Sequence, residues 1–339
     1  MRDADTIRRA WGCMLGQVAG DSLGSQVEFK DAEQIRELYP SGMENLEGSK
    51  LYRTLPGQPT DDSEMALALA RVLAEQDEFR AEPVLEAYKR WQKSHPVDFA
   101  HAVFRAMHGK VDAKSEANCA LMRVSPLGIF GARRVPASAL SSDGSGLADV
   151  SLLCSDEAMK TLQLWAMEEA ALTNPHPLCR VSSAAYVTAL ACGIRGCGRR
   201  GMYEAALKTV QSLAQDGELG EAALRVQAVL EQAEHGRPAD YQETMSHVLT
   251  ALHNGFWQLL HAEDGGAGVR DTVLQGGDTA ANGAVAGALL GAALDIDTFP
   301  PQWVDSVLAC LPAEGRCDIP RPKEYWPLDF MPLAEKLLG

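Results

Sequence analysis

The stretch WGCMLGQVAGDSLG, residues 11–24, is apolar with a glycine at every fourth position. Gly12, Gly16 and Gly20 are four residues apart, and Gly24 ends the stretch at the same interval. The stretch NGAVAGALLGAAL, residues 282–294, has the same spacing at Gly283, Gly287 and Gly291. Glycine inside a helix costs about 1 kcal/mol relative to alanine, so the two stripes need a compensating gain. Because a glycine stripe lets another backbone approach closely, we expect both helices in one core, side by side, with the residues at their ends in one cleft.

Apolar residues recur at intervals of three and four through the rest of the chain, as in EMALALARVLAEQ and AALRVQAVLEQAEH. This spacing is typical of amphipathic helices, and no convincing period-two strand interrupts it. Two longer segments, residues 39–59 and 135–150, carry the Gly, Pro, Ser and Asn of irregular loops. Apolar helices continue beyond both loops. The sequence therefore predicts an all-α fold in a single compact domain over residues 1–339.

Composition narrows the class of partner. The chain is 46% hydrophobic and 23% charged, as in a soluble globular protein, and carries a net charge of -15. A surface of this charge repels polyphosphate, so we expect no nucleic-acid partner, although a small anion can still bind a locally positive pocket. We also expect no membrane association, since no uncharged apolar run is long enough to cross a bilayer. The N-terminus lacks a classical secretory signal, which predicts a cytoplasmic protein or an effector exported without one.

The segment PGQPTDDSEMALALA, residues 56–70, places two carboxylates side by side where a turn becomes a helix. Asp61 as N-cap with Glu64 three residues later resembles a capping box, which accounts for both of these residues structurally. Asp62 remains unexplained, because two carboxylates within a few ångströms raise each other's pKa unless a cation neutralises them. Oxygen ligands such as these, with the hydroxyl of Thr60, suit a hard cation such as Mg²⁺.

Two further acidic sites stand at the ends of the glycine-striped helices. Asp278 follows a Gly-Gly break and opens the second one, and its alternative role is that of a simple N-cap. Glu28 follows the first one on an irregular segment, where it could equally be a solvated loop carboxylate, and Asp21 could bond local backbone. Either site alone is unremarkable. Their coincidence with Asp61 and Asp62 favours one acidic cleft.

Seven blocks of the chain, in order and with approximate spacing, resemble the ADP-ribosylglycohydrolase family. They are GCMLGQVAGDSLGSQVEF, PGQPTDDSEMALALA, NCALMRVSPLGIF, LTNPHPLC, GFWQLLHA, GGDTAANGAVAGALLGAAL and RPKEYWPLD. The family includes dinitrogenase reductase-activating glycohydrolases and ADP-ribosylarginine hydrolases. The resemblance extends from about Trp11 to Leu337, which is nearly the whole chain.

This resemblance implies an all-helical domain with Mg²⁺, often two ions, at the bottom of a cleft. It further implies hydrolysis of the bond between the distal ribose of ADP-ribose and a protein side chain, most often arginine, so the expected partners are ADP-ribosylated protein or ADP-ribose. Thr60, Asp61 and Asp62 match the family's first metal-binding triplet, and Asp278 matches the first aspartate of its C-terminal metal motif. Catalytic roles are expected for Glu28, as acid or base, and for Asp61 and Asp62.

The chain departs from the family at the C-terminal metal motif. Many relatives have GGDTDT there, whereas this sequence has Ala280 and Ala281 in place of the second aspartate and second threonine. Loss of two oxygen ligands weakens or abolishes one site of a binuclear pair. The outcomes that remain open are a one-metal enzyme, an enzyme for serine-, threonine- or O-acetyl-linked ADP-ribose, and a binding module without catalysis. A purely structural protein is a further alternative.

Substrate contacts are expected at three other residues. Asn118 and Arg123 lie in the segment that resembles the family's ribose and phosphate border, where Arg123 either faces a phosphate or forms a surface ion pair. His176, between two prolines, is grouped with them, although a structural role in a rigid turn fits it equally. Trp257, Tyr325 and Trp326 are expected as core anchors, with adenine stacking as the alternative. The sequence does not indicate the oligomeric state, and a monomer is favoured.

Overall fold

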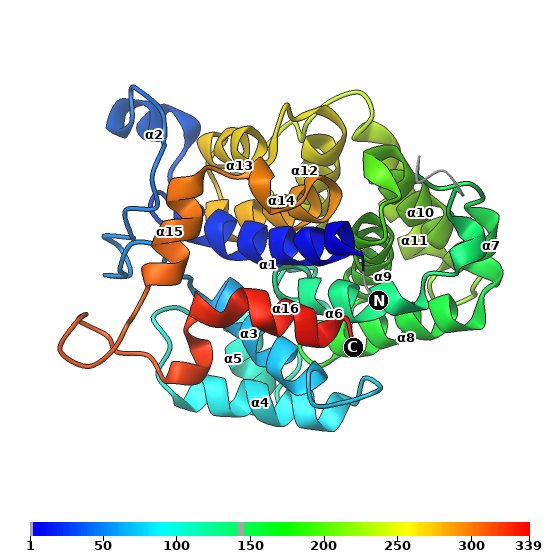
Figure 1. Cartoon of the computed structure of the whole chain (residues 1–339), viewed down its shortest axis with the longest axis horizontal. Coiled ribbons are helices and arrows are strands. Elements are labelled where there is room, and N and C mark those ends of the chain that lie inside the picture. Colours follow the sequence, from blue (N-terminus) through cyan, green and yellow to red (C-terminus); the bar gives the residue numbers. More distant parts are fainter. Residues whose placement is uncertain (1–2, 142–145) are drawn as a thin grey trace.

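The computed structural model describes residues 3–141 and 146–339, and its regular structure there is entirely helical (Figure 1). Helix α1 (Ala4–Gly24) and helix α14 (Thr279–Leu294) run side by side through the centre of the molecule. The backbones touch along the two glycine stripes: an added β-carbon on Gly16 would overlap the carbonyl group of Gly287, and one on Gly20 would overlap that of Gly283. The expected pairing of the two helices is confirmed, and so is the all-α fold.

The other helices surround this pair. Helices α12 (Val248–His261) and α13 (Gly265–Leu274) pack on α14, and α16 (Phe330–Leu337) packs on α1. The remaining helices, in chain order, are α2 (Ala32–Leu38), α3 (Asp61–Leu73), α4 (Ala81–Lys93), α5 (His101–Met107), α6 (Ser125–Gly131), α7 (Ser151–Ser155), α8 (Glu157–Ala171), α9 (Pro177–Ile194), α10 (Gly198–Leu213), α11 (Gly220–Gln232) and α15 (Pro301–Ala309). Short 3₁₀ turns connect several of them.

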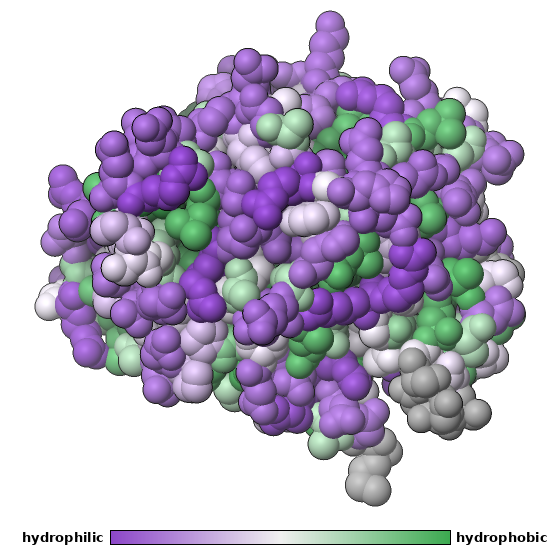
Figure 2. All heavy atoms as spheres, turned by 90° about the horizontal axis from the view of Figure 1, so that it is seen from above, coloured by the Kyte–Doolittle hydropathy of each residue, from purple (hydrophilic) through white to green (hydrophobic). Residues whose placement is uncertain are grey.

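Helix α9 is the second element of the core. By length and apolar composition alone it could cross a membrane, but 89% of it is buried inside the protein. It contacts α8, α10 and α6, so its apolar residues are covered on several sides. One face of the molecule, seen in Figure 2, is largely hydrophilic with small scattered apolar patches. The apolar content of α9 is therefore explained by the core.

The two expected loops differ in how much of them is described. Residues 39–59 form an irregular segment before α3, as expected. The second loop contains a 3₁₀ turn (Ala137–Ala139) and an isolated bridge between Leu140 and Leu147, and its residues 142–145 lie outside the described part of the chain. The first of these loops runs from α2 to the N-terminus of α3, which places Asp61 and Asp62 next to the end of α1.

Candidate active site

A cleft of about 440 Å³ opens where the ends of α1, α3 and α14 meet. Carboxylates from five separate parts of the chain line it: Glu28, Asp61, Asp62, Asp98, Asp112 and Asp278. Of these, Asp112 is paired with Arg105, which also lines the cleft, at 3.8 Å. Asn118 and Ala281 also line it, together with the exposed aromatic rings of Phe29 and Phe99. The structure therefore brings together the acidic residues at the ends of both glycine-striped helices and those at the start of α3.

The start of α3 is held by a carboxylate from α1. Asp21 is fully buried and accepts hydrogen bonds from the Thr60 amide at 3.0 and 3.1 Å, the Thr60 hydroxyl at 2.8 Å and the Ser63 amide at 3.0 Å. Burial raises the pKa of Asp21 to about 6, against the opposing effect of these hydrogen bonds. Asp21 thus caps a remote helix, and it fixes α3 against α1.

This arrangement corrects the expected capping box. Thr60 is the N-cap residue and Asp61 is the first residue of α3. The Glu64 carboxylate is buried and accepts from the Arg321 guanidinium at 2.7 Å and from the Trp91 indole at 2.8 Å. Since Asp21 and Glu64 take up these structural roles, the carboxylates of Asp61 and Asp62 are left to face the cleft.

Asp61 and Asp62 lie in an environment that disfavours negative charge. Burial is the largest cause that raises the pKa of Asp61, and Asp98 and Asp21 raise it further. The pKa of Asp62 is also raised well above its usual value, by burial and then by the charges of Asp21 and Asp61. The Ala100 amide donates to Asp61 Oδ2 at 3.0 Å. Asp62 Oδ1 is buried and has no hydrogen-bond partner within the protein. A buried carboxylate oxygen of this kind is suited to bind a cation or a water.

Glu28 and Asp98 share a tyrosine. The Tyr52 side chain is nearly buried, and its hydroxyl acts to lower the pKa of both carboxyl groups. The pKa of Glu28 is raised well above its ordinary value by burial and by the charges of Asp278 and Asp98, and its Oε2 atom has no partner. Glu28 and Asp98 are therefore neighbouring acidic groups on one side of the cleft, next to the same phenol.

Asp278 occupies the N-cap position of α14, but its side chain makes no capping hydrogen bond. Its Oδ2 instead accepts from the Asn118 side-chain amide at 2.9 Å. The Asn118 backbone amide donates to the Ser246 carbonyl at 2.9 Å, which fixes the segment across the cleft. Asn118 thus holds the Asp278 carboxylate in the cleft, where a ligand would meet it.

These residues fit a hard cation in chemical type. The atoms that could ligate a metal are carboxylate oxygens, which hard cations prefer. Two of them, Glu28 Oε2 and Asp62 Oδ1, are buried and have no hydrogen-bond partner. Within residues 3–141 and 146–339, no three carboxylate, imidazole or thiolate groups are clustered closely enough to enclose a metal ion. Mg²⁺ commonly binds one or two carboxylates and keeps several waters, so a ready-made protein cage is not required. Asp61, Asp62 and Asp278 would hold the ion.

The structure distinguishes the two alanines of the altered motif. Ala281 lines the cleft, whereas Ala280 is fully buried and is not part of the lining. Thr60 is also fully buried, with its hydroxyl 3.2 Å from Asp62 Oδ2 in addition to its contact with Asp21. Oxygen donors at the expected C-terminal positions are therefore missing, while those of the first triplet are adjacent to the cleft.

Arg123 lies in the interior of the protein, so the expected phosphate contact of this residue is wrong. The side chain is fully buried, and its Nε atom lies 2.7 Å from Glu169 Oε1. The guanidinium also donates to the Thr173 hydroxyl at 2.8 Å and stands over the ring of Tyr88 at 4.8 Å. All of these partners are internal, so Arg123 anchors the core beneath the segment that carries Asn118.

His176 likewise does not reach the cleft. It is the N-cap residue of α9, and its Nδ1 accepts from the Leu178 amide at 3.3 Å. Its other ring nitrogen lies 3.5 Å from Glu116 Oε1. The expected substrate contact is corrected to a structural role, because the imidazole borders a separate, smaller depression.

The aromatic residues at the cleft are different from those expected from the sequence. Trp257 stacks on His261 at 3.9 Å, and neither it nor Tyr325 nor Trp326 lines the cleft. Phe29 and Phe99 line it instead, with 53% and 47% of their surface exposed. Each directly follows a cleft carboxylate, Glu28 or Asp98. Asp98 and Phe99 were missed because their segment matches no motif and reads as ordinary loop, whereas Phe29 was missed although it ends the first matched block.

Comparisons with known proteins agree with this architecture. The family model of ADP-ribosylglycohydrolase matches residues 2–335. An ADP-ribosyl-[dinitrogen reductase] glycohydrolase from Rhodospirillum rubrum is 28% identical, with 88% of this chain and 90% of that protein covered. An ADP-ribosylarginine hydrolase from Pseudomonas putida is 22% identical over 89% of this chain and 74% of its own length.

A solved structure described as an ADP-ribosylglycohydrolase-related protein complex shares the fold, with a TM-score of 0.71 and 22% identity over 98% of each chain. The family model covers nearly the whole sequence, and the structural likeness covers the whole fold. On this evidence the chain belongs to the ADP-ribosylglycohydrolase family.

Proposed function

We propose that this protein is a Mg²⁺-dependent hydrolase that removes ADP-ribose from a modified protein side chain, with arginine as the first candidate. The observation that carries the proposal is the convergence of Glu28, Asp61, Asp62, Asp98 and Asp278 in one cleft of a family member. Two relatives bear names that state the removal of ADP-ribose from dinitrogen reductase or from arginine. An acidic cleft also complements the positive charge of a modified guanidinium.

The chain's own groups suit the bond that must break. As water adds to C1 of the distal ribose, the C1–N bond breaks and the electron pair stays on the guanidine nitrogen, which ends with a proton. The positive charge that develops on the sugar is stabilised by the carboxylates of Asp61 and Asp62. Glu28 lies within the same cleft, and its raised pKa makes it a candidate to hold and transfer the proton. When bound, Mg²⁺ supplies a template that orients the vicinal hydroxyls of the ribose.

The test is the release of free ADP-ribose from an ADP-ribosyl-arginine peptide, with Mg²⁺ and with EDTA. We expect release that depends on Mg²⁺ and is lost in Asp61→Ala but retained in Asp305→Ala, an exposed aspartate outside the cleft. No release by the wild-type protein from the arginine peptide would contradict the arginine assignment. The same assay with serine-linked, threonine-linked and O-acetyl-ADP-ribose substrates then decides whether an O-linked bond is cleaved instead.

A second candidate is an ADP-ribose-binding module with impaired catalysis. The observation that favours it is the apolar lining at Ala281, where the family motif that the sequence resembles has a threonine. It predicts ADP-ribose binding measurable by calorimetry and no release from any of the four linkages. Against it stand three buried cleft carboxylates with raised pKa values, Glu28, Asp61 and Asp62. Burying these charges together lowers stability, and binding of ADP-ribose alone gives less reason for that cost.

A further inference from the structure

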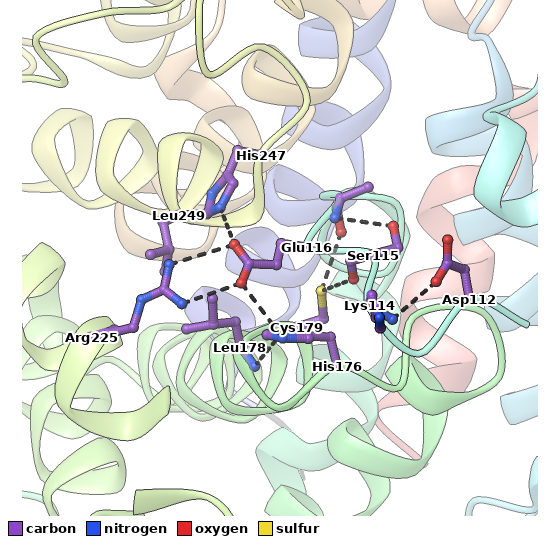
Figure 3. Close-up of polar contacts among 11 residues, drawn as sticks. Asp112, Lys114, Ser115, Glu116, His176, Leu178, Cys179, Arg225, His247 and Leu249 are labelled. Atoms are coloured by element: carbon purple, nitrogen blue, oxygen red, sulfur yellow. Dashed lines mark hydrogen bonds and ion pairs between the residues drawn. The ribbon is translucent and has the colours of Figure 1, made fainter. Parts of the chain in front are cut away.

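The segment 115–118 lies between the cleft and a group of charged side chains outside it. Ser115, Ala117 and Asn118 line the cleft, and Glu116 does not. Figure 3 shows the Glu116 carboxylate directed instead toward His247, Arg225 and His176, which come from three other parts of the chain. Neighbouring residues of one short segment therefore line the cleft and contact this outer group.

Several donors converge on the Glu116 carboxylate. His247 Nε2 lies 2.7 Å from Oε2, and two guanidinium nitrogens of Arg225 lie at 3.2 and 3.5 Å. His176 Nε2 lies 3.5 Å from Oε1. Partial burial tends to raise the pKa of Glu116, but the hydrogen bonds from His247 and Arg225 outweigh it and the pKa is lowered. The carboxylate is thus held in its charged form with both oxygens occupied.

Both imidazoles have a defined orientation. His247 and His176 are the N-cap residues of α12 and α9, and each Nδ1 accepts a backbone amide, from Leu249 at 3.1 Å and from Leu178 at 3.3 Å. An Nδ1 that accepts leaves the ring proton on Nε2, so each Nε2 can donate toward Glu116. Glu116 is thereby tied to the first turns of two helices of the protein interior.

Backbone contacts transmit this anchoring to Asn118. The Val248 amide donates to the Glu116 carbonyl at 2.9 Å, and the Asn118 amide donates to the Ser246 carbonyl at 2.9 Å. These bonds flank an antiparallel bridge between Ala117 and His247. With its backbone fixed on both sides, Asn118 directs its side-chain amide to Asp278 Oδ2 at 2.9 Å.

From this chain of contacts we infer that Glu116 is a positioning residue of the cleft: by fixing segment 115–118 on α9, α11 and α12, it sets the place of Asn118 and through it the Asp278 carboxylate. The consequence for Mg²⁺ affinity rests on the proposed function, whereas the consequence for the order of the segment does not. Glu116 itself touches neither Asp278 nor the cleft. Its effect must therefore pass through Asn118.

The informative variant is Glu116→Gln, because it keeps the size of the side chain and turns one carboxylate oxygen into an NH₂ group. That group faces a donor of His247, Arg225 or His176 and cannot accept from it. The matched control is Glu218→Gln, which removes a neighbouring surface ion pair with Arg180 at 2.7 Å and leaves segment 115–118 untouched. Glu218 has 72% of its side chain exposed, so a small effect is expected there.

Two measurements test the inference. Hydrogen exchange of a peptide spanning residues 115–119 should be about tenfold faster in Glu116→Gln than in the wild type or in Glu218→Gln. Calorimetric titration with Mg²⁺ should show about tenfold weaker binding for both Glu116→Gln and Asn118→Ala, in the range typical of outer-sphere partners of a metal. The double variant should bind Mg²⁺ no more weakly than Asn118→Ala alone, because both changes act through one contact.

The outcomes separate this inference from the function. Wild-type protein that binds no Mg²⁺ and releases no ADP-ribose contradicts the proposed function, and the exchange experiment still decides the role of Glu116. Unchanged exchange at residues 115–119 in Glu116→Gln overturns the inference. Additive losses of Mg²⁺ affinity in the double variant also overturn it, since Glu116 would then act independently of Asn118.

Discussion

Gly16 of α1 and Gly287 of α14 are in direct backbone contact: each would place an added β-carbon on the carbonyl oxygen of the other. The same reciprocal contact is repeated one turn away at Gly20 and Gly283. This contact fixes the axial position of α1 relative to α14. Because Glu28 follows α1 and Asp278 precedes α14, it also sets which carboxylates meet in the cleft.

Gly16→Ala is expected to destabilise the protein by about 2 kcal/mol or more, since neither backbone can move without disturbing the other contacts along the stripe. The matched control is Gly217→Ala, where no atom lies within 4 Å of an added β-carbon and the backbone is not left-handed. That change is expected to stay within about 0.5 kcal/mol. Urea unfolding of both variants is the measurement, and equal stabilities would contradict the close packing of α1 on α14.

Arg123→Met is expected to lower the free energy of unfolding by about 3–5 kcal/mol, because it leaves the buried Glu169 carboxylate without its cation. Adding Glu169→Leu should recover much of the loss, as the unpaired charge is then removed as well. Chemical denaturation of the single and double variants measures this. If Arg123→Met instead kept full stability and lost affinity for ADP-ribose, Arg123 would be a ligand residue after all.

Asp62→Asn is expected to stabilise the metal-free protein, on the order of 1 kcal/mol, because burial, Asp21 and Asp61 all act against charge at this position. In return the variant should lose the stabilisation by Mg²⁺, which for the wild type reaches about 2.7 kcal/mol at one hundred times the dissociation constant. Thermal unfolding with EDTA and with Mg²⁺ compares the two, with Asp305→Asn as the control. A variant that is less stable in EDTA and keeps its Mg²⁺ response would speak against a cation site at Asp62.

Restoring oxygen donors tests the altered motif. We expect the Ala280→Asp/Ala281→Thr variant to bind Mg²⁺ about tenfold more tightly than the wild type, as it restores two ligands of the family pattern. Ala281→Thr alone places its hydroxyl at the cleft and should supply part of the gain. Ala280→Asp alone introduces a carboxylate at a fully buried position and should also lower stability. Calorimetry that shows no change in affinity for the double variant would contradict the proposed place of the ion.

The sequence predicted the parts of this structure that depend on local pattern. Helical periodicity and the glycine stripes identified the core pair, and helix-boundary carboxylates identified Asp61, Asp62, Asp278 and Glu28 as neighbours. Contacts between distant segments had no such signal. Asp21 was expected to bond local backbone, but its partners are Thr60 and Ser63 on α3.

The remaining differences between the predicted and the observed site arise because the sequence does not show which remote group a polar side chain contacts. From the sequence, Arg123 was expected to face a phosphate or to form a surface ion pair, and only the fold shows that its partner is the buried carboxylate of Glu169 on α8. Asp98 precedes a short helix in a segment without a motif, and it becomes notable only where the fold places it in one cleft with Glu28. Which remote group a polar side chain meets is a property of tertiary packing, and local sequence pattern does not contain that information.

The most direct test is a crystal structure of the protein with Mg²⁺ and ADP-ribose. We expect density for an ion among Asp61, Asp62 and Asp278, in contact with the hydroxyls of the distal ribose, with Asn118 still bonded to Asp278. Ligand bound elsewhere, or these three carboxylates turned apart with no ion between them, would contradict the assignment of this cleft as the active site.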